Sequence, residues 1–148
     1  MPTGNDHAAT VLLTGATGFV GRNLYPFLVD HGYRVRCAAR SPDRARQRYP
    51  DRDWVKLDLD EPSTVDAALE GCQAAYFLIH RMSDRRDYEE RERRDALLFA
   101  QASQRAQVKR IVYLGGMKPA GRSSKHLRSR VVCGEAVGTL VSNEAESR

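Results

Sequence analysis

Residues 10–21 read T-V-L-L-T-G-A-T-G-F-V-G, a short apolar run that ends in three glycines spaced three positions apart. The apolar run predicts a β-strand, and the apolar Phe19, Val20 and Leu24 beyond it predict a helix. A strand, a glycine turn and a helix in this order form the arrangement that holds the pyrophosphate of a dinucleotide. A glycine turn with a purely structural role is the alternative interpretation.

Each of the three glycines is expected to have its own task. Gly15 permits a tight turn where a Cβ would clash, and Gly18 allows phosphates to approach the backbone. Gly21 lets the helix pack closely on the sheet. The first helical turn then offers unpaired N–H groups and the positive end of its dipole to an anion. The cofactor-binding residues predicted in this stretch are Gly15, Thr17, Gly18, Phe19, Val20 and Gly21.

The composition predicts one globular, soluble domain, because the 148 residues are 41% hydrophobic and 29% charged. No apolar stretch approaches the roughly 18 residues of a membrane helix, so no membrane span is expected. The polar first nine residues show no secretory signal, and we expect a cytoplasmic protein. Cys37, Cys72 and Cys133 lie far apart without metal-type spacing, so we expect reduced thiols and no metal site.

The net charge of +5 raises the question of nucleic-acid binding. Arginines gather in residues 40–52, 81–94 and 122–130, but acidic residues interrupt the middle cluster and largely cancel its charge. Aromatic residues are not interspersed as stacking platforms would require. Solvated helix faces explain most of these charges. A basic nucleic-acid-binding module is therefore kept only as a third hypothesis, and a nucleic-acid partner is not expected.

Strand and helix patterns alternate along the chain. Strands are expected at 10–13, 34–39, 54–57, 74–79 and 109–114, and helices at about 18–31, 42–48, 61–71 and 88–106. This alternation predicts an α/β fold, a doubly wound parallel sheet of Rossmann-like type with helices on both faces and right-handed crossovers. The expected strand order is 3-2-1-4-5, which places a ligand crevice at the carboxyl ends of strands 1 and 4.

The predicted domain boundaries follow from the ends of these patterns. Residues 1–9 are expected to form a disordered tail, residues 10–138 the dinucleotide-binding domain, and residues 139–148 a polar tail. The fold is thus expected to stop after the helix that follows strand 5, through natural truncation or because the chain is a fragment. An unpaired strand 5 would expose a sheet edge, and homo-oligomerisation is one expected way to cover it.

Four motifs together carry a family resemblance. They are T-G-A-T-G-F-V-G at 14–21, L-D-L-D at 57–60, R-I-V-Y-L-G-G at 110–116 and H-L-R-S-R at 126–130. On these residues the chain resembles the atypical and extended short-chain dehydrogenase/reductase superfamily, and within it the NmrA-like and NAD(P)H-binding, epimerase-like members. The resemblance covers about residues 10–138 and implies a dinucleotide cofactor.

The residues after strand 2 bear on which dinucleotide is bound. NAD-preferring sites carry an acid there that accepts from the ribose 2′-hydroxyl, whereas this chain has Arg40 and Ser41, with no acid until Asp43. A guanidinium and a hydroxyl favour a 2′-phosphate through charge-assisted hydrogen bonds. We therefore expect NADP(H), with NAD(H) as the alternative cofactor. Arg40 stacking on adenine or facing water is the competing interpretation.

The ends of strands 3 and 4 supply three further candidates. The resemblance implies that Asp58 accepts a hydrogen bond from the adenine amino group, and Leu59 beside it is included in the cofactor site. A helix-capping aspartate is the alternative role of Asp58. His80 is expected to lie along the cofactor crevice, with a bystander role as its alternative.

The catalytic pair of the superfamily, a tyrosine with a lysine four residues later, has no counterpart in this chain. Tyr88 is followed at that spacing by Glu92, and Tyr113 by Met117. His126 and Arg130 are four residues apart in about the expected region, so histidine could act as general acid and arginine could hold a phosphate or ribose oxygen. A solvated helix face is the alternative for this pair.

Two functional hypotheses follow. The first is the NAD(P)-binding domain of an oxidoreductase- or epimerase-like protein that lacks the usual tyrosine–lysine pair. The second is a non-catalytic, NmrA-like dinucleotide sensor or scaffold that regulates a protein partner. The sequence leaves open whether the protein is an enzyme, and it identifies neither a small-molecule substrate nor a protein partner.

Overall fold

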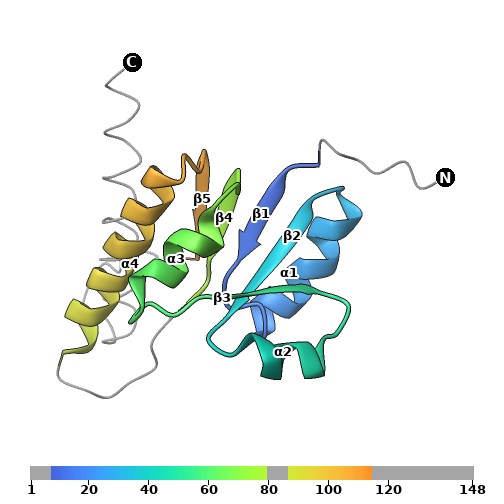
Figure 1. Cartoon of the computed structure of the whole chain (residues 1–148), viewed down its shortest axis with the longest axis horizontal. Coiled ribbons are helices and arrows are strands. Elements are labelled where there is room, and N and C mark those ends of the chain that lie inside the picture. Colours follow the sequence, from blue (N-terminus) through green and yellow to red (C-terminus); the bar gives the residue numbers. More distant parts are fainter. Residues whose placement is uncertain (1–7, 80–86, 115–148) are drawn as a thin grey trace, which may run out of the picture.

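The computed structural model describes residues 8–79 and 87–114, in which five strands and four helices alternate (Figure 1). The strands are β1 (Thr10–Leu13), β2 (Arg34–Ala39), β3 (Asp53–Lys56), β4 (Ala74–Phe77) and β5 (Arg110–Tyr113). The helices are α1 (Phe19–Asp30), α2 (Pro42–Arg48), α3 (Pro62–Leu69) and α4 (Tyr88–Arg105). All strand pairs are parallel and the order is β3-β2-β1-β4-β5, which confirms the predicted fold class and topology.

The helices cover the two faces of the sheet separately. Along β1, Val11 and Leu13 pack with α1 and α2, whereas Leu12 between them packs with α3 and α4. The strands β1 to β4 each contribute apolar side chains to both layers, as expected of a parallel sheet buried on both sides, whereas β5 contributes Ile111 and Tyr113 to the layer of α3 and α4. In Figure 1, α3 and α4 lie together on one side of the sheet, away from α1 and α2. None of the helices within the described ranges is long and apolar enough to cross a membrane.

The first helix ends where the sequence predicted. Gly32 has φ of +85°, and its N–H donates to the carbonyl of Val29 while the N–H of Tyr33 donates to the carbonyl of Leu28. These two bonds form the Schellman arrangement, in which glycine adopts the left-handed conformation at low cost. Pro26 lies inside α1 without ending it. The helix therefore ends at Asp30, and Gly32 turns the chain out of the helix.

The third helix is tied to the sheet by Arg36 of β2. Its Nη1 donates to the carbonyls of Ala68 and Glu70 at 2.8 and 2.7 Å, at the end of α3 where carbonyls lack intrahelical partners. Gly71, with φ of +74°, then turns the chain toward β4. The apolar face predicted for α3 is confirmed, since Val65, Ala68 and Leu69 are fully buried.

The topology fixes where a ligand crevice can form. β1 and β4 are neighbours, while the helices that follow them, α1 and α4, cover opposite faces. The chain connections therefore diverge at the carboxyl ends of β1 and β4, which is where ligands bind in folds of this type.

Candidate functional site

The glycine turn after β1 lies directly against the chain that follows β4. Gly15 has φ of +61°, and a Cβ at this residue would lie 3.1 Å from the carbonyl oxygen of Leu78 and 3.2 Å from its Cβ. The turn is closed by the N–H of Gly18, which donates to the carbonyl of Gly15 at 3.0 Å. The tight turn predicted at Gly15 is confirmed, and it needs glycine for both its conformation and its surroundings.

Gly21 is the most crowded of the described glycines. A Cβ there would lie 2.2 Å from the carbonyl oxygen of Gly15 and 2.8 Å from the Cα of Ala16. The sequence predicted that Gly21 packs the helix against the sheet, whereas its nearest neighbours are atoms of the glycine turn itself. The absence of a side chain at Gly21 therefore sets the distance between the first turn of α1 and the loop that precedes it.

The start of α1 is open to an anion. Gly18 is the N-cap and provides no side-chain hydrogen bond, and the first turn carries no acidic residue. Among the described residues, no acceptor is hydrogen-bonded to the amides of Phe19 or Val20. Thr17 and Gly18 are exposed, and Phe19 is 76% exposed. Free amides and a positive helix end are the features that bind phosphate at a helix N-terminus.

Thr14 holds this turn in place, a role that the glycine pattern does not indicate. Its buried hydroxyl donates to the carbonyl of Tyr76 at 2.7 Å and accepts from the N–H of Leu78 at 2.9 Å. The Leu78 amide thus leaves the strand ladder, which explains why β4 ends at Phe77 and not at Ile79 as predicted. A polar residue closing an apolar strand was the available signal, because a buried hydroxyl requires partners.

Replacing Thr14 with valine is expected to lower the free energy of unfolding by about 2 kcal/mol, since it removes the acceptor of the part-buried Leu78 amide. Dinucleotide affinity should fall about tenfold, because the glycine turn keeps its backbone hydrogen bond to Tyr76 but loses the two hydrogen bonds of the Thr14 hydroxyl. Urea unfolding and calorimetric titration measure the two effects. Thr10→Val at the other end of β1 is the control, since no hydrogen bond of the Thr10 side chain to a described residue is seen. Equal behaviour of the two variants would contradict this role.

Arg40 and Ser41 follow β2 at the same end of the sheet, and both are exposed. Arg40 makes no hydrogen bond or ion pair with another residue of the described part of the chain. Ser41 is the N-cap of α2, but its hydroxyl makes no capping bond. The nearest acid, Asp43, is paired with Arg46 at 3.0 Å. A guanidinium and a hydroxyl are thus available here, and the charge of the closest carboxylate is compensated.

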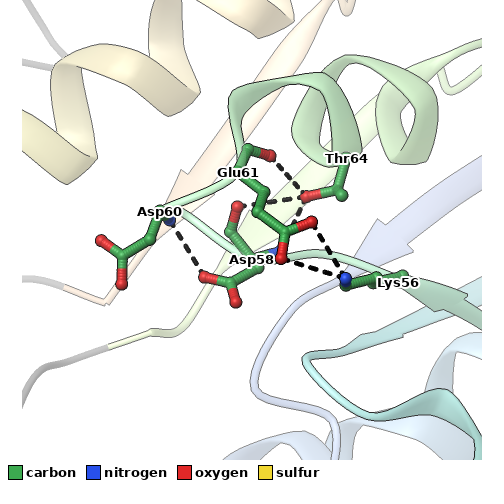
Figure 2. A network of polar contacts seen from close by, with 5 residues as sticks. All are labelled: Lys56, Asp58, Asp60, Glu61 and Thr64. Carbon is green, nitrogen blue, oxygen red and sulfur yellow. Dashed lines mark hydrogen bonds and ion pairs between the residues drawn. The ribbon is translucent and has the colours of Figure 1, made fainter.

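Asp58 lies in a tight turn between β3 and α3 (Figure 2). Its Oδ1 accepts the N–H of Asp60 at 3.0 Å, and among the described residues Oδ2 has no hydrogen-bond donor. The N-cap of α3 is Glu61, so the alternative role of Asp58 as a helix cap is wrong. Because residues 58–61 form this turn, the N-cap position falls on Glu61, three residues after Asp58. Asp58 therefore keeps one carboxylate oxygen for another partner.

Leu59 does not present its side chain to this site. It is 5% exposed and belongs to the core beneath α3 and α4. Only its backbone could contact a cofactor. Three other predicted site residues lie outside the described residues, namely His80, His126 and Arg130.

The thiols and the metal-ligating residues suggest no further chemistry within residues 8–79 and 87–114. Burial raises the pKa of the Cys37 thiol to about 12 and also raises the pKa of Cys72, so neither is a thiolate near neutral pH. No group of His, Cys, Asp or Glu side chains in these ranges could hold a metal ion. An open groove of about 550 Å³ lies between the ends of α3 and α4, lined by Asp66, Glu70 and Arg105. It is close to the amino ends of β4 and β5, away from the glycine turn.

Comparisons with known proteins agree with this geometry. A family model described as NAD(P)H-binding matches residues 15–134. Dihydroflavonol 4-reductase of Dianthus caryophyllus is 35% identical over 79 residues, which are 47% of this chain and 22% of that protein. A putative dihydroflavonol 4-reductase of Synechocystis sp. is 32% identical over 115 residues, which are 74% of this chain and 33% of that protein. The chain thus spans a third or less of the length of these two curated relatives.

A solved structure with the same fold is the Citrobacter sp. triphenylmethane reductase complexed with NADP(H). It is 18% identical to this chain with a TM-score of 0.74, and the match covers 88% of this chain and 46% of the reductase. This likeness confirms the predicted Rossmann-like fold.

Proposed function

The chain belongs to the NAD(P)H-binding family, as an atypical member of the short-chain dehydrogenase/reductase superfamily, and from this premise we propose that it binds NADP(H) in preference to NAD(H). The proposal is carried by two features at this end of the sheet: the uncapped first turn of α1, and Arg40 after β2, which pairs with no other residue of ranges 8–79 and 87–114. The amides of Phe19 and Val20 take the pyrophosphate, and Arg40 takes the 2′-phosphate of the adenine ribose.

Electrostatics support this choice of cofactor. The 2′-phosphate carries negative charge, and a guanidinium can bind two of its oxygens at once. An acid after β2 would repel that phosphate, whereas the closest one, Asp43, is already paired with Arg46. Ser41 adds a hydroxyl that is not used in capping α2. Asp58 completes the site by accepting from the adenine amino group through Oδ2.

We further propose that this domain is the cofactor-binding part of a reductase- or epimerase-type protein. Its relatives of greater length include proteins described as dihydroflavonol 4-reductases, which supports a role in hydride transfer. The second candidate is an NmrA-like sensor that binds the cofactor without converting a substrate, and it is favoured by the missing tyrosine–lysine pair in this sequence. Consumption of NADPH with a panel of carbonyl substrates separates the two, because a sensor binds NADPH without oxidising it.

Calorimetric titration of the wild-type chain with NADP⁺ and NAD⁺ tests the proposal. We expect both to bind, with NADP⁺ about tenfold tighter, because the 2′-phosphate adds charge-assisted hydrogen bonds worth about 1.4 kcal/mol or more. The preference should shrink as salt is raised, since the charges are exposed and screened. Tighter binding of NAD⁺, or no binding of either dinucleotide at millimolar concentration, would contradict the proposal.

A further inference from the structure

We infer that Thr64 is a positioning residue for Asp58, and that its hydroxyl makes the site selective for adenine over bases without an amino group. The inference rests on the proposed function, because it assumes that a dinucleotide occupies the carboxyl end of the sheet. Thr64 lies in the first turn of α3 and is six residues away from Asp58 in the sequence.

The Thr64 hydroxyl contacts both backbone groups of Asp58 (Figure 2). It accepts the N–H of Asp58 at 2.9 Å, and its own proton is shared between the carbonyls of Asp58 at 3.1 Å and Glu61 at 2.7 Å. The Asp58 carbonyl also accepts the N–H of Glu61 at 2.9 Å. One hydroxyl therefore fixes the peptide units on both sides of the Asp58 side chain, and with them the direction of its Cα–Cβ bond.

The carboxylate of Asp58 is fixed by a separate contact. The N–H of Asp60 holds Oδ1 at 3.0 Å, which leaves Oδ2 as the acceptor without a partner among the described residues. In Figure 2 this carboxylate points away from α3. The turn thus presents one anionic oxygen in a set direction, which is the geometry needed to accept a single N–H of a ligand.

Adenine and hypoxanthine differ at the group that would meet this oxygen. The adenine amino group donates, whereas hypoxanthine carries a carbonyl oxygen that would face the carboxylate as a second acceptor. A site built to accept a hydrogen bond rejects a ligand that lacks the donor more strongly when its own acceptor is rigidly held. Loss of the Thr64 hydroxyl should therefore reduce this discrimination more than it reduces binding through the pyrophosphate.

The experiment titrates the full chain with NADP⁺ and NAD⁺, each compared with its hypoxanthine analogue. We expect the wild type to prefer the adenine dinucleotides about tenfold. Thr64→Val, which keeps the shape and removes the hydroxyl, should reduce the preference to about twofold, and Thr64→Ser should restore it. In an Asp58→Ala background, Thr64→Val should change the preference no further, because the positioned acceptor is already gone.

Two control variants separate positioning from general stability. Ser63→Ala removes the neighbouring hydroxyl, which makes no hydrogen bond with a described residue, and should keep both the preference and the melting temperature. Leu69→Val thins the core at the other end of α3, so it should lower the melting temperature and keep the preference. If Thr64→Val does not fold, Thr64→Ala takes its place in the series.

The outcomes distinguish the inference from the proposed function. A wild-type preference that survives Thr64→Val unchanged would overturn the inference while cofactor binding stands. Equal affinity of the wild type for adenine and hypoxanthine dinucleotides would overturn the acceptor role of Asp58, and the inference with it. Failure of the wild type to bind any of the four ligands would overturn the proposed function itself.

Discussion

Gly21→Ala is expected to abolish measurable dinucleotide binding and to destabilise the fold. The added Cβ would lie 2.2 Å from the carbonyl oxygen of Gly15, so α1 must move away from the glycine turn. The amides of Phe19 and Val20 would then no longer be placed to donate hydrogen bonds to the pyrophosphate. Two charge-assisted hydrogen bonds, each worth about 1.5–3 kcal/mol, correspond to a loss of about hundredfold or more in affinity. Calorimetric titration measures the loss.

Helix propensity and the clash predict opposite signs for the change in the free energy of unfolding caused by Gly21→Ala. Helix propensity alone would make alanine more stable than glycine in α1 by up to about 1 kcal/mol, whereas the clash should cost about 1–3 kcal/mol. Gly71→Ala is the matched control, because its Cβ would meet nothing within 4 Å and only the φ of +74° is strained. That variant should lose stability and keep normal dinucleotide affinity. A Gly21→Ala protein that is stabilised and binds normally would contradict the close approach of helix and turn.

Arg40→Ala is expected to weaken binding of NADP⁺ by about tenfold to a hundredfold while leaving NAD⁺ affinity nearly unchanged. The range corresponds to charge-assisted hydrogen bonds between one guanidinium and a phosphate. The selectivity arises because NAD⁺ lacks the 2′-phosphate that Arg40 would contact. Parallel titrations with the two dinucleotides measure the ratio of affinities, which is insensitive to the fraction of folded protein.

Arg34→Ala is the control for the Arg40 variant. Both arginines are exposed, but Arg34 is the first residue of β2, whereas Arg40 follows the last residue at the other end of the strand. Arg34→Ala lowers the net charge by one, as Arg40→Ala does, so it reports the effect of net charge alone. Equal loss of affinity for both dinucleotides in Arg40→Ala, or equal effects of the two substitutions on NADP⁺, would show that Arg40 does not recognise the 2′-phosphate.

The fold could be predicted from local sequence patterns because those patterns have a direct physical cause. The apolar runs at β1 and β4 are the strands that are covered on both faces, and the glycines at 15, 32 and 71 occupy positions with positive φ. Strand order then follows from the handedness of the crossovers. Element ends were less predictable, since β4 ends early when Leu78 donates to Thr14, a residue 64 positions earlier.

The candidate site was predictable in its glycine turn and less so in its supporting contacts. The open start of α1 follows from the glycine spacing and from the absence of an acid in the first turn. The partners of Asp58 do not follow from the sequence. An acid shortly before Pro62 fits a helix cap equally well, and only the turn at 58–61 shows that Glu61 takes that position. Likewise, the crowding at Gly21 depends on the path of the turn, which no local pattern specifies.

A crystal structure of this chain grown with saturating NADP⁺ tests the central claim most directly. The pyrophosphate oxygens should accept hydrogen bonds from the backbone nitrogens of Phe19 and Val20 at about 2.7–3.1 Å, with the adenosine half extending toward Arg40. Cofactor density at another place, such as the groove between the ends of α3 and α4, or a bare α1 terminus at saturation, would contradict it.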